Sequence, residues 1–341
     1  IHLLGQIKQC FDQPFDVQGQ SHSITATMGV AVYPQSGLDA DTLLRNADIA
    51  LYRAKEQGRN TYQFYTEGMQ EREVMRLELD KDLSQALANN EFVLFYQPQL
   101  NLNTGEIQSV EALIRWRHPR RGLLPPVEFI PLAEESGRIT DIGRWVVMAA
   151  CRQLAAWKGT PHEGLRIAVN LSGRELDDED LVDHIREALA AENVPANRLE
   201  VELTEEIFIQ NIEHNLNQLS RLHQLGVHLA IDDFGVGYSS LGYLRDFPVD
   251  LLKIDRSFIT EVTERHDDAV ITRAVINLAH NLGIEVVAEG VETEEQLSFL
   301  KNHRCNFAQG YLISRPIPVS DLEKALASGV LVAGITADSG L

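Results

Sequence analysis

The chain is poor in the residues that build disulfide scaffolds and membrane spans. Its 341 residues include three cysteines, Cys10, Cys151 and Cys305, which lie far apart and form no CxxC pair. This usage is typical of a reducing compartment, and we expect each cysteine to be a small buried hydrophobe rather than a metal ligand. No apolar run approaches the ~18 residues of a membrane span, and no signal peptide is visible. We therefore expect a cytoplasmic location, either for a free protein or for the cytoplasmic part of a larger, membrane-tethered sensor.

Positive charge is also scarce. Thirty Lys and Arg face 50 Asp and Glu, which gives a net charge of −20 and a pI near 4.9. So acidic a surface argues against binding duplex nucleic acid or an anionic membrane without specific contacts. An anionic substrate would need local positive charge from metal ions or from a few well-placed basic residues. The hydrophobic content of 44% is that of a globular protein.

The first 68 residues form one predicted unit. Apolar periodicity predicts helices over residues 1–11 and 39–60, and strands over 24–34 and 60–65. A unit of this length has a thin core for an independent domain. It therefore has the pattern of a partial α/β domain.

A different pattern follows. Residues 69–90 have helical spacing and are predicted to form a connecting helix, followed by a domain over 91–330 and a tail over 331–341. Strands that alternate with helices predict an α/β fold of the TIM (β/α)₈ barrel type. The eight β-rich runs are 92–99, 110–116, 165–172, 199–205, 228–234, 251–258, 285–292 and 307–313.

Polar residues stand at or near the carboxyl ends of these runs. In barrels, the carboxyl ends of the strands converge on one mouth, where active sites are built. Several acids aimed at one mouth would repel each other without counter-charge, so we expect bound cations. The residues are Gln97, Glu111, Arg115, Asn170, Glu202, Glu205, Asp232, Asp233, Lys253, Asp255, Glu289, Glu292 and Gln309.

Asp232 and Asp233 are the most telling pair, because neighbours in a strand point to opposite faces. They serve one site only if the strand ends there, and Gly235 and Gly237 indicate such an end. An acidic turn is the alternative interpretation. Carboxylates with an amide oxygen favour Mg²⁺ or Mn²⁺, and adjacent acids suit two metals about 3.5–4 Å apart. Lys253 would then orient a water or neutralise charge, and the chemistry would be hydrolysis of a phosphate ester.

Together these residues resemble the EAL family of cyclic di-GMP phosphodiesterases. The naming motif stands here as Glu111-Ala112-Leu113, within an ordered series that covers the chain from about 75 to 325. One three-letter motif is weak, whereas the ordered series is very specific. The other motifs are QPQ (97–99), FIPLAEESG (129–137), VNLS (169–172), ELTE (202–205), DDFGVGYSSL (232–241), KIDRSFI (253–259), AEGVET (288–293) and QGYLISRP (309–316).

The resemblance implies a modified TIM barrel in which the strand that bears the EAL motif runs antiparallel to the others. It also implies two divalent metal ions, Mg²⁺ or Mn²⁺. By matching position, the metal ligands are Glu111, Asn170, Glu202, Asp232, Asp233 and Glu289.

The resemblance assigns further roles. Lys253 matches the lysine beside the nucleophilic water, Asp233 and Glu289 belong to the catalytic centre, and Glu205 matches the acid that holds the DDFG loop. Glu289 has also been cast as a general base, but a metal-bound carboxylate is a poor base, so we favour the ligand role. Substrate contacts are implied for Gln97, Leu113, Arg115, Gln309 and Glu292.

The first unit resembles the C-terminal part of a GGDEF diguanylate cyclase domain. The matching pieces are ATMGVAVYP and ADIALYRAKEQGRN, and the GGDEF signature itself is absent. This fragment is therefore not expected to make cyclic di-GMP. The family resemblance also implies a homodimer through the barrel face near the DDFG loop, with Tyr238 to Leu244 linking partner contact to catalysis.

We predict a metal-dependent phosphodiesterase of bacterial second-messenger signalling that opens cyclic di-GMP to linear 5′-pGpG. In-line attack would come from a hydroxide that bridges the metals. The alternative is a catalytically silent cyclic di-GMP receptor, which should lack at least one metal acid. A barrel glycosidase would need two acids rather than six and aromatic platforms, and aromatics are only 7%. A barrel that is acidic for solubility alone would leave the strand-end acids unexplained.

Overall fold

The structure is a computed structural model that describes residues 2–11, 15–17, 20–22, 24–56, 58, 60–209, 211–236 and 244–328. The chain divides into two compact units, Ile1–Leu83 and Ser84–Leu341. Each unit is described by itself below. The boundaries predicted at residues 68 and 90 stay predictions, and the predicted tail lies outside the described residues.

The first unit has a small β-α-β element at its centre. Strands β3 (Met28–Val30) and β4 (Tyr62–Phe64) pair in parallel, and α2 (Ala40–Glu56) connects them. The predicted helix and strands are therefore present, although each strand is shorter than predicted. The unit also contains α1 (His2–Gln9) and an antiparallel pair of β1 (Phe15–Val17) and β2 (Gln20–His22), while α3 (Met69–Ala86) begins in this unit and ends beyond Leu83.

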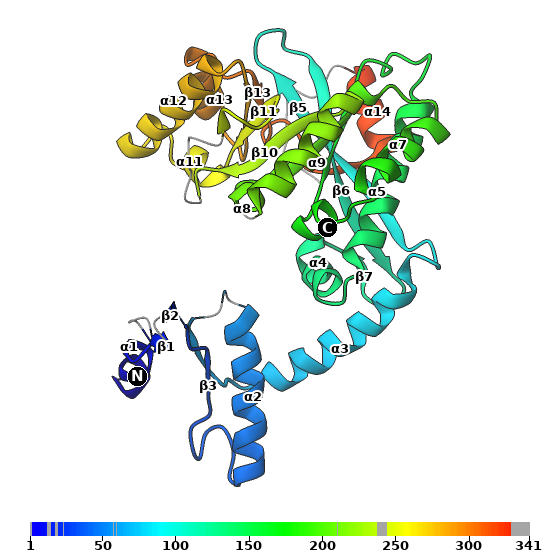
Figure 1. The fold of residues 1–341 in the computed structure, drawn as a ribbon. Coiled ribbons are helices and arrows are strands. Elements are labelled where there is room, and N and C mark those ends of the chain that lie inside the picture. The colour runs from blue at the N-terminus through cyan, green and yellow to red at the C-terminus, as the bar shows by residue number, and fades with distance from the viewer. Residues whose placement is uncertain are drawn as a thin grey trace. The chain divides into compact units, whose positions relative to one another are not determined.

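Helix α2 is stabilised by a cap at its N-terminus and by close packing on β3. Asp39 caps it, because its carboxylate accepts from the Thr42 amide and hydroxyl, both at 2.9 Å. Figure 1 shows α2 beside β3, and a side chain at Gly29 would lie 2.0 Å from the carbonyl oxygen of Ala47. Glycine at position 29 therefore allows the helix to pack directly on the strand.

The second unit is a closed barrel of eight strands. The hydrogen-bonded order runs β5-β13-β12-β11-β10-β9-β8-β6, and a further β5–β6 pairing closes the circle. This confirms the predicted barrel, and every predicted run overlaps one of its strands. They are β5 (Phe92–Asn101), β6 (Ile107–His118), β8 (Arg166–Asn170), β9 (Leu199–Thr204), β10 (His228–Phe234), β11 (Leu251–Ile254), β12 (Glu285–Ala288) and β13 (Phe307–Ala308), with β7 (Gly122–Leu124) and β14 (Ile317–Pro318) added at the sides.

One strand of the barrel runs against the rest, and it is not the predicted one. Strand β6, which bears the EAL motif, pairs with β8 in parallel. Strand β5 is antiparallel to both of its neighbours, β6 and β13. The prediction that the motif-bearing strand is reversed was therefore wrong. So was the placement of Gln97 at the end of its strand, because β5 continues to Asn101 and Gln97 lies within it, directly opposite Glu111.

The connection between β5 and β6 explains the reversal. It spans residues 102–106, too few for the crossover of a dozen or more residues that parallel neighbours need. The turn is built locally, because the side-chain oxygen of Asn101 accepts from the amides of Asn103 and Thr104. Gly105 completes it with a φ of 76°. The Asn- and Gly-rich turn was therefore the sequence signal for an antiparallel pair.

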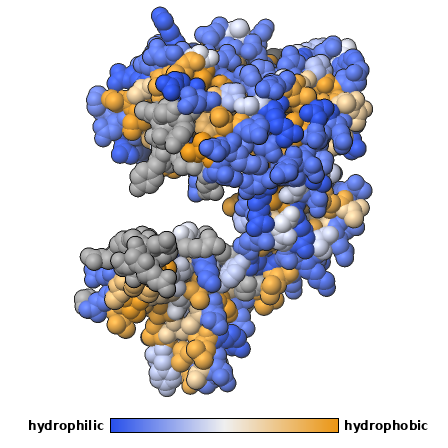
Figure 2. All heavy atoms as spheres, in the orientation of Figure 1, coloured by the Kyte–Doolittle hydropathy of each residue, from blue (hydrophilic) through white to orange (hydrophobic). Residues whose placement is uncertain are grey.

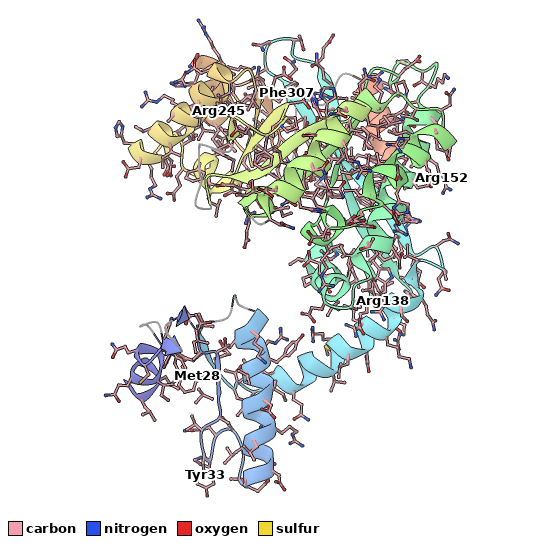
Figure 3. All side chains as sticks on the ribbon, viewed as in Figure 1. Met28, Tyr33, Arg138, Arg152, Arg245 and Phe307 are labelled. Carbon is pink, nitrogen blue, oxygen red and sulfur yellow. The ribbon has the colours of Figure 1, made fainter. Side chains whose placement is uncertain are left out.

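Helices cover the outside of the barrel, with α12 and α13 on the opposite side from α5, α7 and α14 in Figure 1. Phe307, labelled in Figure 3, is buried with Ala230, Leu251 and Val287 in a core cluster. The visible outer face of this unit is largely hydrophilic (Figure 2). The helices are α4 (Pro126–Glu135), α5 (Ile139–Ala156), α6 (Gly173–Leu176), α7 (Leu181–Ala191), α8 (Glu205–Ile209), α9 (Ile212–Leu225), α11 (Arg256–Thr260), α12 (His266–Asn281), α13 (Glu294–Asn302) and α14 (Val319–Ser328).

The three cysteines differ in their environment. Cys151 and Cys305 are buried and free, as predicted, and burial raises the pKa of both thiols to about 12. Cys10 is exposed, so the expectation of a buried residue was wrong there. It lies just past the end of α1, where the thiol donates to the Gln6 carbonyl at 3.3 Å.

Candidate active site

The parallel strands bring polar side chains together at their carboxyl ends. Asn170 is the last residue of β8, and Glu289 and Gln309 follow β12 and β13 directly. Glu202 lies two residues before the end of β9, and Lys253 one residue before the end of β11. The predicted convergence on one mouth therefore holds for the parallel strands.

Lys253 is the centre of the cluster, and its side chain has no solvent exposure. Its Nζ lies 2.7 Å from Glu202 Oε2 and 2.8 Å from Glu289 Oε1. Asp232 Oδ1 is 3.2 Å away and Glu111 Oε2 3.7 Å away. Four carboxylates from four different strands or strand ends thus surround one ammonium group.

The charge state of Lys253 follows from these neighbours. Burial alone would lower its pKa, but the four carboxylates outweigh burial and raise the pKa well above its ordinary value. The ammonium group therefore keeps its proton throughout the physiological range. One positive charge still leaves the four acids in excess.

Glu111 is the best satisfied of the acids. Its Oε1 accepts from Asn170 Nδ2 at 2.8 Å, and its Oε2 accepts from Gln309 Nε2 at 2.5 Å. Burial would raise the pKa of Glu111, but Lys253 and these two amide donors outweigh burial and lower it. Glu111 is therefore held as a carboxylate.

Glu202 and Glu289 are less well compensated. Burial raises the pKa of Glu202 well above its usual range, and the neighbouring carboxylates of Glu111 and Asp232 add to the shift. Burial likewise raises the pKa of Glu289 to about 8, again with Asp232 and Glu111 adding to it and Lys253 opposing it. The mouth is thus short of positive charge.

The backbone brings Asp232 and Asp233 to the same side. Asp233 has a φ of 54°, in the left-handed region that residues other than glycine rarely adopt. The register of β10 with β11 shifts between Ile231 and Phe234, as at a β-bulge. This kink answers the problem of two adjacent acids, because it breaks the alternation that would send their side chains to opposite faces.

The donors fit a hard divalent cation. Within the described ranges, Asp232, Asp233 and Glu289 each offer a carboxylate oxygen, and the three oxygens lie within 4.8 Å of one another. One more oxygen, Glu202 Oε1, is buried and has no hydrogen-bond partner. Mg²⁺ and Mn²⁺ prefer oxygen ligands, and a buried carboxylate oxygen without a hydrogen-bond partner is available to bind such an ion.

Comparison with known families agrees with this geometry. The model of the EAL domain matches residues 80–316, more than half of the chain. The chain belongs to the EAL domain family. The model of the diguanylate cyclase GGDEF domain matches residues 2–61, which confirms the resemblance of the first unit to part of such a domain.

The chain is similar to two proteins of Pseudomonas aeruginosa over almost its whole length. It is 44% identical over 326 residues to the cyclic di-GMP phosphodiesterase NbdA, covering 95% of this chain and 42% of NbdA. It is 43% identical over 325 residues to the bifunctional diguanylate cyclase/cyclic di-GMP phosphodiesterase MucR, covering 95% of this chain and 47% of MucR. The chain therefore spans less than half the length of these curated relatives.

Solved structures match the EAL domain as well. A structure of the MucR phosphodiesterase in complex with c-di-GMP has a TM-score of 0.70 and 44% identity, and the match covers 72% of this chain and 99% of that one. The EAL enzyme Bd1971, with cAMP and cyclic-di-GMP bound, also has a TM-score of 0.70, with 31% identity over 85% of this chain and 76% of that one.

None of the helices in the described ranges has both the length and the apolar character to cross a bilayer.

Glu205 in this EAL domain contacts the loop that it is predicted to hold. Its Oε2 accepts from the Gly235 amide at 2.9 Å, which ties the start of α8 to the end of β10. Gly235 has a φ of 103°, and a side chain there would meet the ring of Phe258 at 2.8 Å. The loop after the two aspartates therefore depends on glycine at this point.

The predicted substrate contacts differ in burial and in the groups that they touch. Gln97 is buried, donates to the Ser314 carbonyl at 3.1 Å and accepts from Gln309 at 3.1 Å. Leu113 and Arg115 point the same way along β6, and the Arg115 guanidinium lies 5.6 Å from the Phe95 ring centre. Glu292 is exposed, in the loop before α13. The assigned roles of all these residues stay predictions.

Sequence reasoning missed Gln99, which belongs to the same hydrogen-bonded network. Its Nε2 donates to Gln309 Oε1 at 2.9 Å, and its side chain is almost fully buried. The signal was present, because Gln97 and Gln99 are alternate residues of one strand and therefore share a face. Asn306 has a structural contact nearby, since its Oδ1 accepts from the Val286 amide at 2.9 Å.

The predicted dimer segment, Tyr238 to Leu244, lies outside the described residues except for Leu244, which is buried. The homodimer and the link between partner contact and catalysis stay predictions.

Proposed function

We propose that this EAL domain is a metal-dependent phosphodiesterase that hydrolyses cyclic di-GMP to linear 5′-pGpG. The observation that carries the proposal is the complete set of acids around the buried Lys253. A domain that only bound the nucleotide would have no need for so many acids close to a substrate that is itself an anion. The names of NbdA and MucR, both phosphodiesterases of cyclic di-GMP, support the same activity.

Two divalent ions, Mg²⁺ or Mn²⁺, are the proposed cofactors. Bound metal ions would lower the pKa of a water molecule and stabilise the negative charge that develops on the phosphate. Their proposed ligands share oxygen donors and a place at the barrel mouth: Glu111, Asn170, Glu202, Asp232, Asp233 and Glu289.

The chain's own residues would orient the reaction. Lys253 keeps its proton and would donate hydrogen bonds to the attacking water or to a phosphate oxygen. Arg115, on the strand of the EAL motif, suits a phosphate because its guanidinium presents two parallel donors. Glu205 would hold the loop after Asp233 in the geometry that keeps both aspartates on the site.

The reaction is a single displacement at phosphorus. The oxygen of a water molecule forms a bond to one phosphorus of the cyclic dinucleotide, in line with the ribose 3′ oxygen. The bond from phosphorus to that 3′ oxygen breaks, the oxygen leaves with a proton, and the ring opens to pGpG. We favour a ligand role for Glu289 over that of general base, because a carboxylate bound to metal is a poor base.

The test is hydrolysis of cyclic di-GMP in Mg²⁺ or Mn²⁺, followed by chromatography, with Asp232→Asn beside the parent. We expect pGpG from the parent and a loss of turnover of at least about 100-fold in the variant. Asp183→Asn is a matched control, since Asp183 is a half-exposed aspartate on α7 that pairs with Arg186. Retained binding of cyclic di-GMP without any turnover would instead identify a silent receptor.

A further inference from the structure

The reversed strand β5 lies between the two strands that carry Glu111 and Gln309. It pairs with β6 so that Gln97 lies opposite Glu111, and Gln99 opposite Ser109. On its other side it pairs with β13, where Ala308 lies opposite Leu100. Gln309 follows Ala308 directly, so the side chains of β5 bridge Gln309 and the EAL motif.

A continuous hydrogen-bonded chain crosses this bridge. The Ser109 hydroxyl donates to Gln99 Oε1, and Gln99 Nε2 donates to Gln309 Oε1 at 2.9 Å. Gln309 Nε2 then donates to Glu111 Oε2 at 2.5 Å and to Gln97 Oε1 at 3.1 Å. All five side chains are buried, with Ser109 and Gln99 almost inaccessible to solvent.

The direction of this chain is imposed at one end. A carboxylate only accepts, so Glu111 requires the NH₂ group of Gln309 and leaves the Gln309 carbonyl facing Gln99. That buried carbonyl requires a donor, which Gln99 supplies. If the Gln309 amide turned over, its carbonyl would face the Glu111 carboxylate and its NH₂ would face the NH₂ of Gln99. Both contacts would be lost at once, which is costly in a buried network.

We propose that Gln99 is a positioning residue for the phosphodiesterase site, which it serves by donating to the Gln309 carbonyl and so stabilising the orientation in which Gln309 donates to Glu111, while its own carbonyl accepts from the Ser109 hydroxyl. This inference rests on the proposed function only for the effect on turnover. The orientation of Gln309 is a property of the protein without nucleotide. Gln99 itself touches neither Glu111 nor Lys253 through any hydrogen bond or ion pair found among the described residues, so its effect passes through Gln309.

A double-mutant cycle separates positioning from mere packing. We expect Gln99→Met to lower kcat/KM about tenfold, and to have less than a twofold effect when Gln309 is already methionine. Gln218→Met is the matched control, because Gln218, on α9, is also a buried glutamine. Its side-chain amide donates to the Asp178 carbonyl at 3.0 Å. The effect of Gln218→Met should be small and the same in both backgrounds. Independent effects of Gln99→Met and Gln309→Met, which multiply, would overturn the proposal.

A second measurement does not need turnover. In ¹⁵N-labelled protein without nucleotide, Gln99→Met should shift the side-chain amide resonances of Gln309 and speed their exchange with solvent, while Gln218→Met leaves them in place. Ser109→Ala, a milder change in case Gln99→Met does not fold, should move the same resonances in the same direction. Unmoved Gln309 resonances would overturn the inference. If the parent shows no turnover, the proposed function fails, and these resonances alone decide the role of Gln99.

Discussion

The two ends of the barrel carry charged side chains on the same strands, but these side chains differ in solvent exposure and in their partners. At the amino ends, Arg166 Nε lies 3.6 Å from Glu200, and Asp250 accepts from the Leu229 amide. The Asp250 and His228 side chains are about a third exposed, at 33% and 31%. At the carboxyl ends, Lys253 is fully enclosed among its acids. Asp250 and His228 at the amino ends thus reach water, although Glu200 there is buried, whereas Lys253 at the carboxyl ends contacts four carboxylates.

This difference shows where the barrel needs cations. Charges open to water are screened and cost little, whereas buried like charges raise each other's pKa. The pKa of Glu202 at the mouth is raised by burial and further by the charges of Glu111 and Asp232. The mouth therefore concentrates more negative charge than Lys253 alone can balance, which favours bound cations.

Removing the ammonium group of Lys253 should have the largest effect. We expect Lys253→Met to reduce turnover by about 1,000-fold or more and to destabilise the metal-free protein by about 3–5 kcal/mol at neutral pH, because the acids lose their buried partner. Urea unfolding and hydrolysis assays would measure both. The destabilisation should shrink at acidic pH, where the carboxylates take up protons. A stability loss that does not vary with pH would contradict this account.

Glu200 and Glu202, on one face of β9, allow a direct comparison of the two ends of the barrel. We expect Glu202→Gln to lower turnover about 100-fold, and Glu200→Gln to leave it within about threefold, because only Glu202 contacts Lys253 through a hydrogen bond. Steady-state kinetics at saturating Mg²⁺ would measure the ratio. Equal losses would mean that the amino end takes part in catalysis and would break the comparison.

Divalent cations should stabilise the mouth in particular. At about a hundred times its Kd, Mg²⁺ should raise the Tm by about 5–10 °C, since it binds the folded state alone. Thermal unfolding of the parent and of a double Asp232→Asn, Asp233→Asn variant would test this. The rise should disappear in the double variant and persist in Asp183→Asn. A rise of the same size in all three would place the cation elsewhere.

Glu175, in the short helix α6 that follows β8, is a buried carboxyl whose pKa is raised mainly by burial. Burial raises its pKa to about 7, although the Ser172 amide and hydroxyl both donate to it. The folded state therefore holds this proton more tightly than the unfolded state, and stability falls as pH rises from about 4.5 to 7. We expect Glu175→Gln to remove about 2 kcal/mol of that fall.

Urea unfolding of the parent and of Glu175→Gln at pH 5 and pH 8 would measure the difference. The variant should gain relative to the parent at the higher pH. Parallel pH dependences in the two proteins would show that the carboxyl of Glu175 is not held in its protonated form.

Much of this protein could be read from local pattern alone. Eight β-rich runs predicted the barrel, because strand period and turn residues act over a few neighbouring positions. Acids at strand ends predicted the mouth, because the carboxyl ends of parallel strands share one edge. The residues predicted as metal ligands all lie at or near that mouth. Four of them are acids that contact Lys253. Asn170 donates to one of these acids, Glu111, and Asp233 lies beside Asp232.

Only the tertiary structure decided three other features. The short turn makes β5 and β6 antiparallel, but only the pairing of β5 with β13 and of β6 with β8 shows that β5 is the reversed strand. The tertiary structure placed both Asp232 and Asp233 on one site through the left-handed backbone of Asp233. It also joined Gln99 to Gln309, which lie 210 positions apart in the chain. Pattern along a chain reports which face a residue takes, whereas strand direction, backbone kinks and distant hydrogen bonds depend on how the strands pair in space.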